Sequence, residues 1–351
     1  MFRGSAGRTG SRLGRMGFVN RKWLKFSLGI SPLLFGGLSL FWGAYGISPL
    51  LTAKILLSKV FFFDATPAPE LSIVWEIRLP RVVLSGVVGA ALSGAGVTLQ
   101  GIFRNPLVDP FILGLSSGAA FGCALSVAVF PQFPIQVAAF LFSLVASFST
   151  YMLARTQGEV SRLHLVLSGI VVSAFFSALV SILKFLVDPH KLVSIVYWLL
   201  GSFSLADWRA VGVVSLSMLA VSFPLILMRW RLNALSMGED EARALGIPVE
   251  RDRLLFIGAA SLAVGSAVSV SGIIGWVGLM VPHLTRMLVG PDHRVLVPFS
   301  LAVGAAFMIF ADTLARNLTA FDLPVGIITT LSGTPFFVYL MKRGAKESWG
   351  K

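Results

Sequence analysis

The chain has 351 residues, of which 56% are hydrophobic and 13% are charged. A soluble domain carries roughly 25% charged residues, so this composition excludes an ordinary soluble enzyme and indicates a polytopic membrane protein. The formal charge of +13 does not indicate nucleic-acid binding, because the basic residues gather before and between apolar runs. The single cysteine, Cys123, excludes an internal disulfide and a thiolate metal cluster.

Residues 1–22 form a basic segment, which we interpret as a cytoplasmic tail. The apolar run from Trp23 to Tyr45 is long and no clear A-x-A site follows it, so we expect an uncleaved first span rather than a signal peptide. Residues 23–342 are expected to form the transmembrane domain, and residues 343–351 a second cytoplasmic tail.

Ten apolar segments follow one another, and each is long enough to cross a hydrocarbon core of roughly 30 Å. Ten is an even number, so both termini are expected on one side of the membrane. Only eight of the 29 Lys and Arg residues fall in segments assigned to the outside, which places the termini in the cytoplasm. The predicted fold class is all-α. The sixth segment holds a short element followed by a span, and the segments are 24–45, 80–102, 111–130, 135–154, 164–186, 195–228, 254–271, 273–289, 297–315 and 325–342.

The string RNPLVDPFILG, residues 104–114, separates two of these segments. It contains an arginine, an aspartate, an asparagine and two prolines, so we predict a loop at the membrane surface. Small residues recur at helical spacing on either side of it, at Gly86, Ala90 and Gly94 and at Gly118 and Gly122. Such rows let membrane helices approach closely, and we predict packing faces there.

The loop 229–253 is predicted to contain a short helix. Glu239, Asp240 and Glu241 lie near its start, where acidic residues suit the helix dipole, and the triplet Gly246-Ile247-Pro248 ends it. An apolar face of Leu235, Ala242 and Leu245 is expected. This helix could lie on the membrane surface or dock a cytoplasmic motor, and composition does not decide between the two.

The chain has no G-x-x-x-x-G-K-[ST] loop, so it cannot bind ATP in that way. GLSSG, residues 114–118, matches the nucleophile-elbow pattern, but it opens a predicted membrane helix, which leaves an intramembrane hydrolase as a minor alternative. His283 could bind a metal or substrate, although a bond to a neighbouring helix is the more common role. Deep ionisable residues are scarce, with Asp312 and Lys184 as candidates, which argues against an ion-coupled secondary transporter.

Residues 70 to 342 resemble the FecCD-type family, the permease subunits of ATP-binding-cassette (ABC) importers for iron–siderophore complexes, haem and cobalamin. The resemblance rests on an ordered set of motifs. These are RLPR (78–81), SGAGVTLQGIFRNPLVDPFILG (93–114), YWLLGSF (197–203), GEDEARALGI (238–247), GWVGLMVPHLTR (275–286), PDHRVLVP (291–298), AD (311–312) and LPVGIITTLSGTPFF (323–337).

The resemblance implies a type II importer permease with ten transmembrane helices in the cytoplasmic (inner) membrane of a prokaryote. It implies a homodimer, two cytoplasmic ATP-binding subunits and an extracytoplasmic substrate-binding protein as partners. The chain itself is then not an enzyme and binds no cofactor, since ATP and Mg belong to the partner ATPase. A ferric siderophore is the expected cargo, haem or cobalamin the next, and an oxyanion such as molybdate the alternative within the family.

The resemblance also assigns residues. GEDEARALG matches the coupling helix that sits in a cleft of the ATPase, which favours the docking interpretation of loop 229–253. The coupling residues are then Gly238, Glu239, Ala242, Leu245 and Gly246.

Two further sets follow from the same resemblance. Asn105 and Leu107 match the cytoplasmic gate of the cobalamin-transporting member, and Ser161 matches part of a second gate, although Arg162 follows it. Arg78, Arg81 and Arg316 match arginines that pair with acidic residues of the binding protein. Our topology also places these three outside, where an alternative role is a lipid-headgroup anchor.

Overall fold

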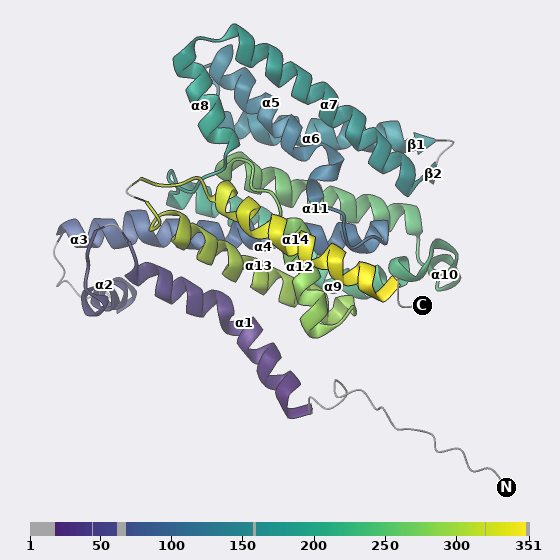
Figure 1. The fold of residues 1–351 in the computed structure, drawn as a ribbon, viewed down its shortest axis with the longest axis horizontal. Helices are drawn as coiled ribbons and strands as arrows, with labels where there is room; N and C mark the ends of the chain where they lie inside the picture. The colour runs from purple at the N-terminus through teal and green to yellow at the C-terminus, as the bar shows by residue number, and fades with distance from the viewer. Residues whose placement is uncertain (1–17, 44, 62–67, 157–158, 320, 349–351) are drawn as a thin grey trace.

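The computed structural model describes residues 18–43, 45–61, 68–156, 159–319 and 321–348. Helices dominate these residues, with one short antiparallel pair of strands (Figure 1). The elements in chain order are α1 (Phe18–Phe41), α2 (Pro49–Phe61), α3 (Ala68–Ser72), the π-helix η2 (Ile73–Arg78), α4 (Leu79–Phe103), the 3-10 helix η3 (Pro110–Leu113), α5 (Leu115–Ala128), α6 (Ile135–Ala154), β1 (Arg155–Thr156), β2 (Glu159–Val160), α7 (Arg162–Leu186), α8 (Pro189–Leu199), α9 (Trp208–Met237), α10 (Glu239–Ala244), α11 (Val249–Ser271), α12 (Val277–Val289), α13 (His293–Ala315) and α14 (Val325–Ser348).

Helix α4 is the centre of the bundle. Together with α3 and η2 it forms one helical stretch, Pro69–Phe103. In the most apolar part of this stretch, 83% of the residues are buried. Helices α9, α11, α12 and α13 pack around it, and α1 lies along α13. Helices α5 to α8 form a second group on the other side of α11 (Figure 1).

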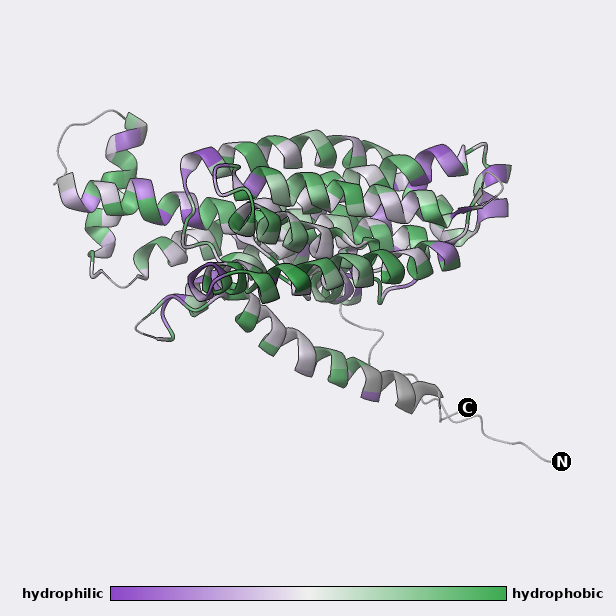
Figure 2. Ribbon diagram, turned by 90° about the horizontal axis from the view of Figure 1, so that it is seen from above, coloured by the Kyte–Doolittle hydropathy of each residue, from purple (hydrophilic) through white to green (hydrophobic). Residues whose placement is uncertain are grey.

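Seven of the described helices are long and apolar enough to cross a membrane. Three shorter apolar helices, Leu115–Ala128, Val277–Val289 and Val325–Leu340, accompany them. Each of the ten apolar segments predicted from the sequence overlaps one of these helices, while the number of true crossings stays a prediction. Hydrophobic residues cover the middle of the bundle and hydrophilic residues gather toward its ends, as a membrane-embedded protein requires (Figure 2).

The close packing predicted for small residues is found between α5 and α6. A Cβ atom on Gly118 would lie 2.3 Å from the Phe142 carbonyl oxygen, and one on Gly122 would lie 2.3 Å from that of Ala138. The tightest approach of α4 to α13, between Gly89 and Gly304, lies outside the predicted rows. Glycine is therefore required where these backbones touch.

The predicted boundaries were wrong in two places. Helix α9 continues to Met237 and α11 begins at Val249, so the loop between them spans 238–248 rather than 229–253. No glycine or proline interrupts residues 229–237, which lets the helix extend beyond the apolar segment. The helices α2 and α3 were not predicted, because residues 49–61 carry two lysines and are too short for a span.

The two predicted tails are only partly described. Residues 1–17 of the basic N-terminal segment lie outside the described residues, and α1 already begins at Phe18. At the other end, α14 continues to Ser348, so most of the expected tail 343–351 extends this helix.

Candidate functional site

The loop between α9 and α11 contains a short helix, α10, as the sequence predicts. Gly238 ends α9 and precedes α10, while Gly246 has a left-handed backbone with φ of 74°. The Gly246 amide donates to the Arg243 carbonyl at 2.9 Å, and the Ile247 amide donates to that of Ala242 at 3.0 Å. These two bonds satisfy the last carbonyls of α10, and glycine suits the left-handed position between them.

Glu239 joins α10 to two long helices. Its Oε1 atom accepts hydrogen bonds from Arg162 Nη2 at 3.0 Å and from Arg253 Nη2 at 2.7 Å. Arg162 begins α7 and Arg253 lies in the first turns of α11. Arg253 also donates to Glu250 at 3.0 Å and to the Val160 carbonyl of β2. A displacement of α10 would therefore act on both helices through one carboxylate.

The apolar residues of this loop do not share one face, contrary to the prediction. Leu235 and Ala242 are buried against the bundle, whereas the side chain of Leu245 is 62% exposed. The α10 helix ends at Ala244, so Leu245 leaves the helical repeat before it could join the other two. Leu245 therefore does not take part in the packing of the bundle.

The loop between α4 and η3 has a fixed shape. Asn105 Oδ1 accepts the Leu107 amide at 2.9 Å, and Asp109 accepts the Phe111 amide at 2.8 Å. Burial raises the pKa of Asp109 to about 6, although this hydrogen bond acts in the opposite direction. Arg104, whose φ is 53°, donates from Nη2 to the Met237 carbonyl at 2.6 Å. The last residue of α9 before Gly238 is thus bonded to this loop.

Leu107, which is half exposed, lines a narrow apolar cavity between the loop, α12 and α14 that has no room for a water molecule. His283 lines the same cavity, and its ring lies edge-on to Phe336 with centroids 6.2 Å apart. Ser161 does not line this cavity and instead precedes α7 beside Arg162. The structure of one chain therefore does not bring the three predicted gate residues together.

Arg78, Arg81 and Arg316 lie near one another, but their side chains are buried. Arg78 and Arg81 are 4% and 8% exposed, and the Arg316 side chain is 7% exposed. Arg78 donates to the carbonyls of Leu40 and Tyr45, and Arg316 donates to that of Ser39 at 2.8 Å. These contacts hold the end of α1, and the docking role of the three arginines stays a prediction.

Arg81 is the centre of an ion-pair cluster. Its Nε and Nη2 atoms donate to the Asp312 carboxylate at 2.9–3.1 Å, and its Nη1 atom lies 2.7 Å from Asp322 Oδ2. Ser204 also donates to Asp322, at 3.0 Å. Although burial opposes it, the hydrogen bond from Arg81 holds the pKa of Asp322 below its ordinary value. The cluster ties α4 and α13 to the loops that follow α8 and α13.

No group of three or more metal-ligating side chains occurs among the described residues. Ser117, in the nucleophile-like string, donates to the Gly114 carbonyl of its own helix at 2.9 Å.

Each of the relatives described here is named as a permease, although their cargoes differ. The chain is 44% identical over 316 residues to the probable iron chelatin transport system permease protein of Helicobacter pylori, which covers 90% of this chain and 95% of that protein. It is 39% identical to the molybdate import system permease protein of Haemophilus influenzae, over 91% and 96% of the two chains. Other relatives are named as cobalamin and hemin permeases.

A solved structure, described as an inward-facing conformation of a metal-chelate type ABC transporter, superimposes with a TM-score of 0.81. It is 37% identical in sequence and covers 92% of this chain and 99% of its own. The model of the FecCD transport family matches residues 32–343. The chain therefore belongs to the FecCD transport family and is a permease of that family.

Proposed function

We propose that this chain is the translocating subunit of an ABC importer whose cargo is a metal chelate, with a ferric siderophore as the first substrate class and haem or cobalamin next. The names of the relatives support the class of cargo. The observation that carries the mechanism is α10, a short acidic helix that Glu239 ties to α7 and α11 and that ends beside the exposed Leu245.

The assembly is a homodimer in a prokaryotic inner membrane, with both termini in the cytoplasm. Two ATP-binding subunits dock on the cytoplasmic loops, and an extracytoplasmic substrate-binding protein delivers the cargo. Family membership supports these partners. In this arrangement Gly238 and Gly246 delimit the docking helix, and Ala242 anchors it to the bundle. Glu239 connects it to α7 and α11, and Leu245 contacts the ATP-binding subunit.

The mechanism is alternating access driven by the partner. ATP binding brings the two ATPase subunits together and shifts α10, and the Arg162–Glu239–Arg253 bonds pass this shift to α7 and α11. The bond from Arg104 to Met237 links the same region to the Asn105–Leu107 loop, the cytoplasmic gate. The ATPase binds α10 more tightly in one of its two positions. This difference in binding free energy favours one of the two access states of the permease.

Replacing residues 239–245 with a Gly/Ser linker tests the coupling role. Uptake should be abolished, while the amount of chain inserted in the membrane and the affinity for the binding protein stay as in the parent. A conservative control, Glu241→Gln, changes an exposed residue of the same helix and should leave uptake intact. Normal uptake by the linker variant would refute the coupling role.

Molybdate transport is the second candidate, because one relative at 39% identity is named for it. Uptake of radiolabelled ferric siderophore and of radiolabelled molybdate by cells that express the complete importer distinguishes the two. Accumulation that follows a proton gradient and continues without the ATPase would instead favour a secondary transporter.

A further inference from the structure

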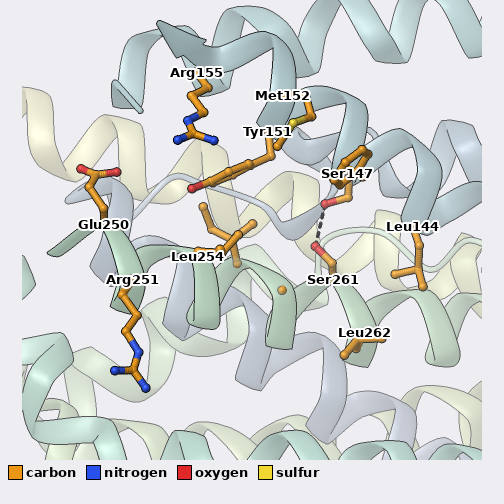
Figure 3. Close-up of a pocket in the computed structure, with 13 residues that line it drawn as sticks. Leu144, Ser147, Tyr151, Met152, Arg155, Glu250, Arg251, Leu254, Ser261 and Leu262 are labelled. Carbon is orange, nitrogen blue, oxygen red and sulfur yellow. Dashed lines mark hydrogen bonds between the residues drawn. The ribbon is translucent and has the colours of Figure 1, made fainter. Parts of the chain in front are cut away.

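An open groove of about 580 Å³ runs between the end of α6 and the start of α11 (Figure 3). Ser147 of α6 and Ser261 of α11 share a hydrogen bond of 2.6 Å across it. Its walls are apolar side chains from both helices, several of them strongly exposed in the chain as it stands. The principal ones are Leu144, Phe148, Met152, Leu254, Ile257 and Leu262.

Charged residues stand at one end of this groove. Tyr151 and Arg155 lie at the end of α6, and Glu250 and Arg251 lie in the first turn of α11, where Glu250 faces Arg155 and Arg251 is directed away from it (Figure 3). Glu250 is already paired, because Arg253 donates to it at 3.0 Å. Among the described side chains, no carboxylate lies within 4.0 Å of Arg155 or of Arg251, and both arginines are exposed. The end of the groove therefore carries uncompensated positive charge.

We propose that this groove binds one anionic phospholipid of the cytoplasmic leaflet. Arg155 would hold its phosphate, with the Tyr151 hydroxyl beside it, and Arg251 would add positive charge from the other side of the first turn of α11 (Figure 3). An acyl chain would lie along the apolar walls toward Ser147 and Ser261. The ligand class follows from the arrangement of charge and apolar surface. Two arginines stand at the ends of two apolar helices, and the apolar groove leads inward from them, as the headgroup and acyl chain of an anionic phospholipid require. Basic pockets between membrane helices bind anionic headgroups in this way.

The site lies beside the coupling helix. Arg253 donates hydrogen bonds to both Glu250 and Glu239. The first turn of α11 therefore lies between the groove and the ion pairs of Glu239. A bound phospholipid would fix the position of this turn. The binding itself does not depend on transport, so it can be tested whether or not the importer is active.

Native mass spectrometry of the purified full-length chain tests the proposal, with dioleoyl phosphatidylglycerol and dioleoyl phosphatidylcholine as probes. The parent should retain phosphatidylglycerol in preference. Each arginine near an anionic headgroup contributes about fivefold in affinity, so Arg155→Gln should reduce that preference by about fivefold, and Arg155→Gln with Arg251→Gln by up to about 25-fold. The matched control, Arg294→Gln, removes an exposed arginine at the start of α13 and should keep the parent's preference.

A second variant blocks the apolar part of the groove without changing its charge. Gly258 lines the groove, and a Cβ atom there has nothing within 4 Å, so Gly258→Phe places a ring in the groove without a clash with the backbone. Cross-linking of a photoactivatable phosphatidylglycerol to peptides of α6 and α11 should fall in this variant. It should not fall in Gly212→Phe, which changes an equally open position on α9.

The two experiments together can support or overturn the proposed lipid site. A preference lost in the double arginine variant, together with cross-linking lost in Gly258→Phe, supports the site. A preference that survives in the double arginine variant, an equal loss in Arg294→Gln, or cross-links confined to other helices would overturn it.

Discussion

Two charged clusters of this chain use the same residue types in opposite ways. The Arg81–Asp312 pair is closed, because Arg81 is 8% exposed and Asp312 is 1% exposed, and only its outer partner Asp322 reaches the solvent. The Arg162–Glu239 pair borders the solvent, because both side chains are about a third exposed, while Arg253 beside them is buried. A buried ion pair that loses one partner leaves an uncompensated charge, whereas a pair near water exchanges partners at little cost. The first cluster is thus suited to hold helices together and the second to transmit movement.

The largest effect is expected where the closed cluster is broken. Arg81→Met leaves Asp312 buried without its main partner, which should destabilise the fold by about 3–5 kcal/mol and lower the yield of folded chain. Thermal unfolding of the purified protein in detergent measures this. Adding Asp312→Leu to the same chain removes the stranded charge and should recover much of the loss. If the single variant is as stable as the parent, the cluster does not hold the bundle.

Glu239→Gln tests the open cluster. The side chain keeps its shape but loses the charge that both arginines contact, so the stability cost should be about 1 kcal/mol, given its exposure to water. Uptake should fall far more than this cost explains, because the link from α10 to α7 and α11 weakens. Comparing unfolding and uptake with those of Glu241→Gln separates the two effects. An equal loss of uptake in both variants would contradict a specific role for Glu239.

The left-handed end of α10 provides a smaller test. Gly246 has φ of 74°, and a Cβ atom there would meet nothing within 4 Å, so Gly246→Ala should cost about 1 kcal/mol through the backbone alone. Gly258→Ala, in the interior of α11 with the same open surroundings, should instead stabilise by about 0.5–1 kcal/mol. Chemical unfolding of both variants under one set of conditions shows whether the sign differs between the two positions.

The smallest change in stability is expected at Leu245. Since this side chain is 62% exposed, Leu245→Ser should alter the free energy of unfolding by no more than about 0.5 kcal/mol. Its effect should appear in the affinity for the ATP-binding subunit, measured by titration of the purified partner. Unchanged affinity would show that the exposed leucine is not part of the docking surface.

The sequence was informative wherever a local rule applies. Gly238, the acidic triplet 239–241 and the Gly-Ile-Pro end predicted α10, and the break at residues 104–114, which contains η3, was predicted from its prolines and charges. Family motifs supplied the candidate coupling and gate residues, which neither periodicity nor composition could have identified.

Other features depend on pairings that no local pattern contains. Glu239 lies 77 residues from Arg162, and Arg81 lies 231 residues from Asp312. The sequence placed Arg81 at the start of the apolar segment 80–102, but it could not show that a carboxylate from α13 would enclose it. The extension of α9 to Met237 was missed for a similar reason, since hydropathy marks the membrane segment and not the helix.

The central claim is that this chain translocates its cargo only when a separate ATPase moves α10. Vesicles that contain the chain, the ATP-binding subunit and the substrate-binding protein test it directly, with ATP on the side of the ATPase. The account predicts accumulation of the chelate with this complete set, and none when the ATPase is omitted or residues 239–245 are replaced. Accumulation by the chain alone, driven by an ion gradient, would contradict it.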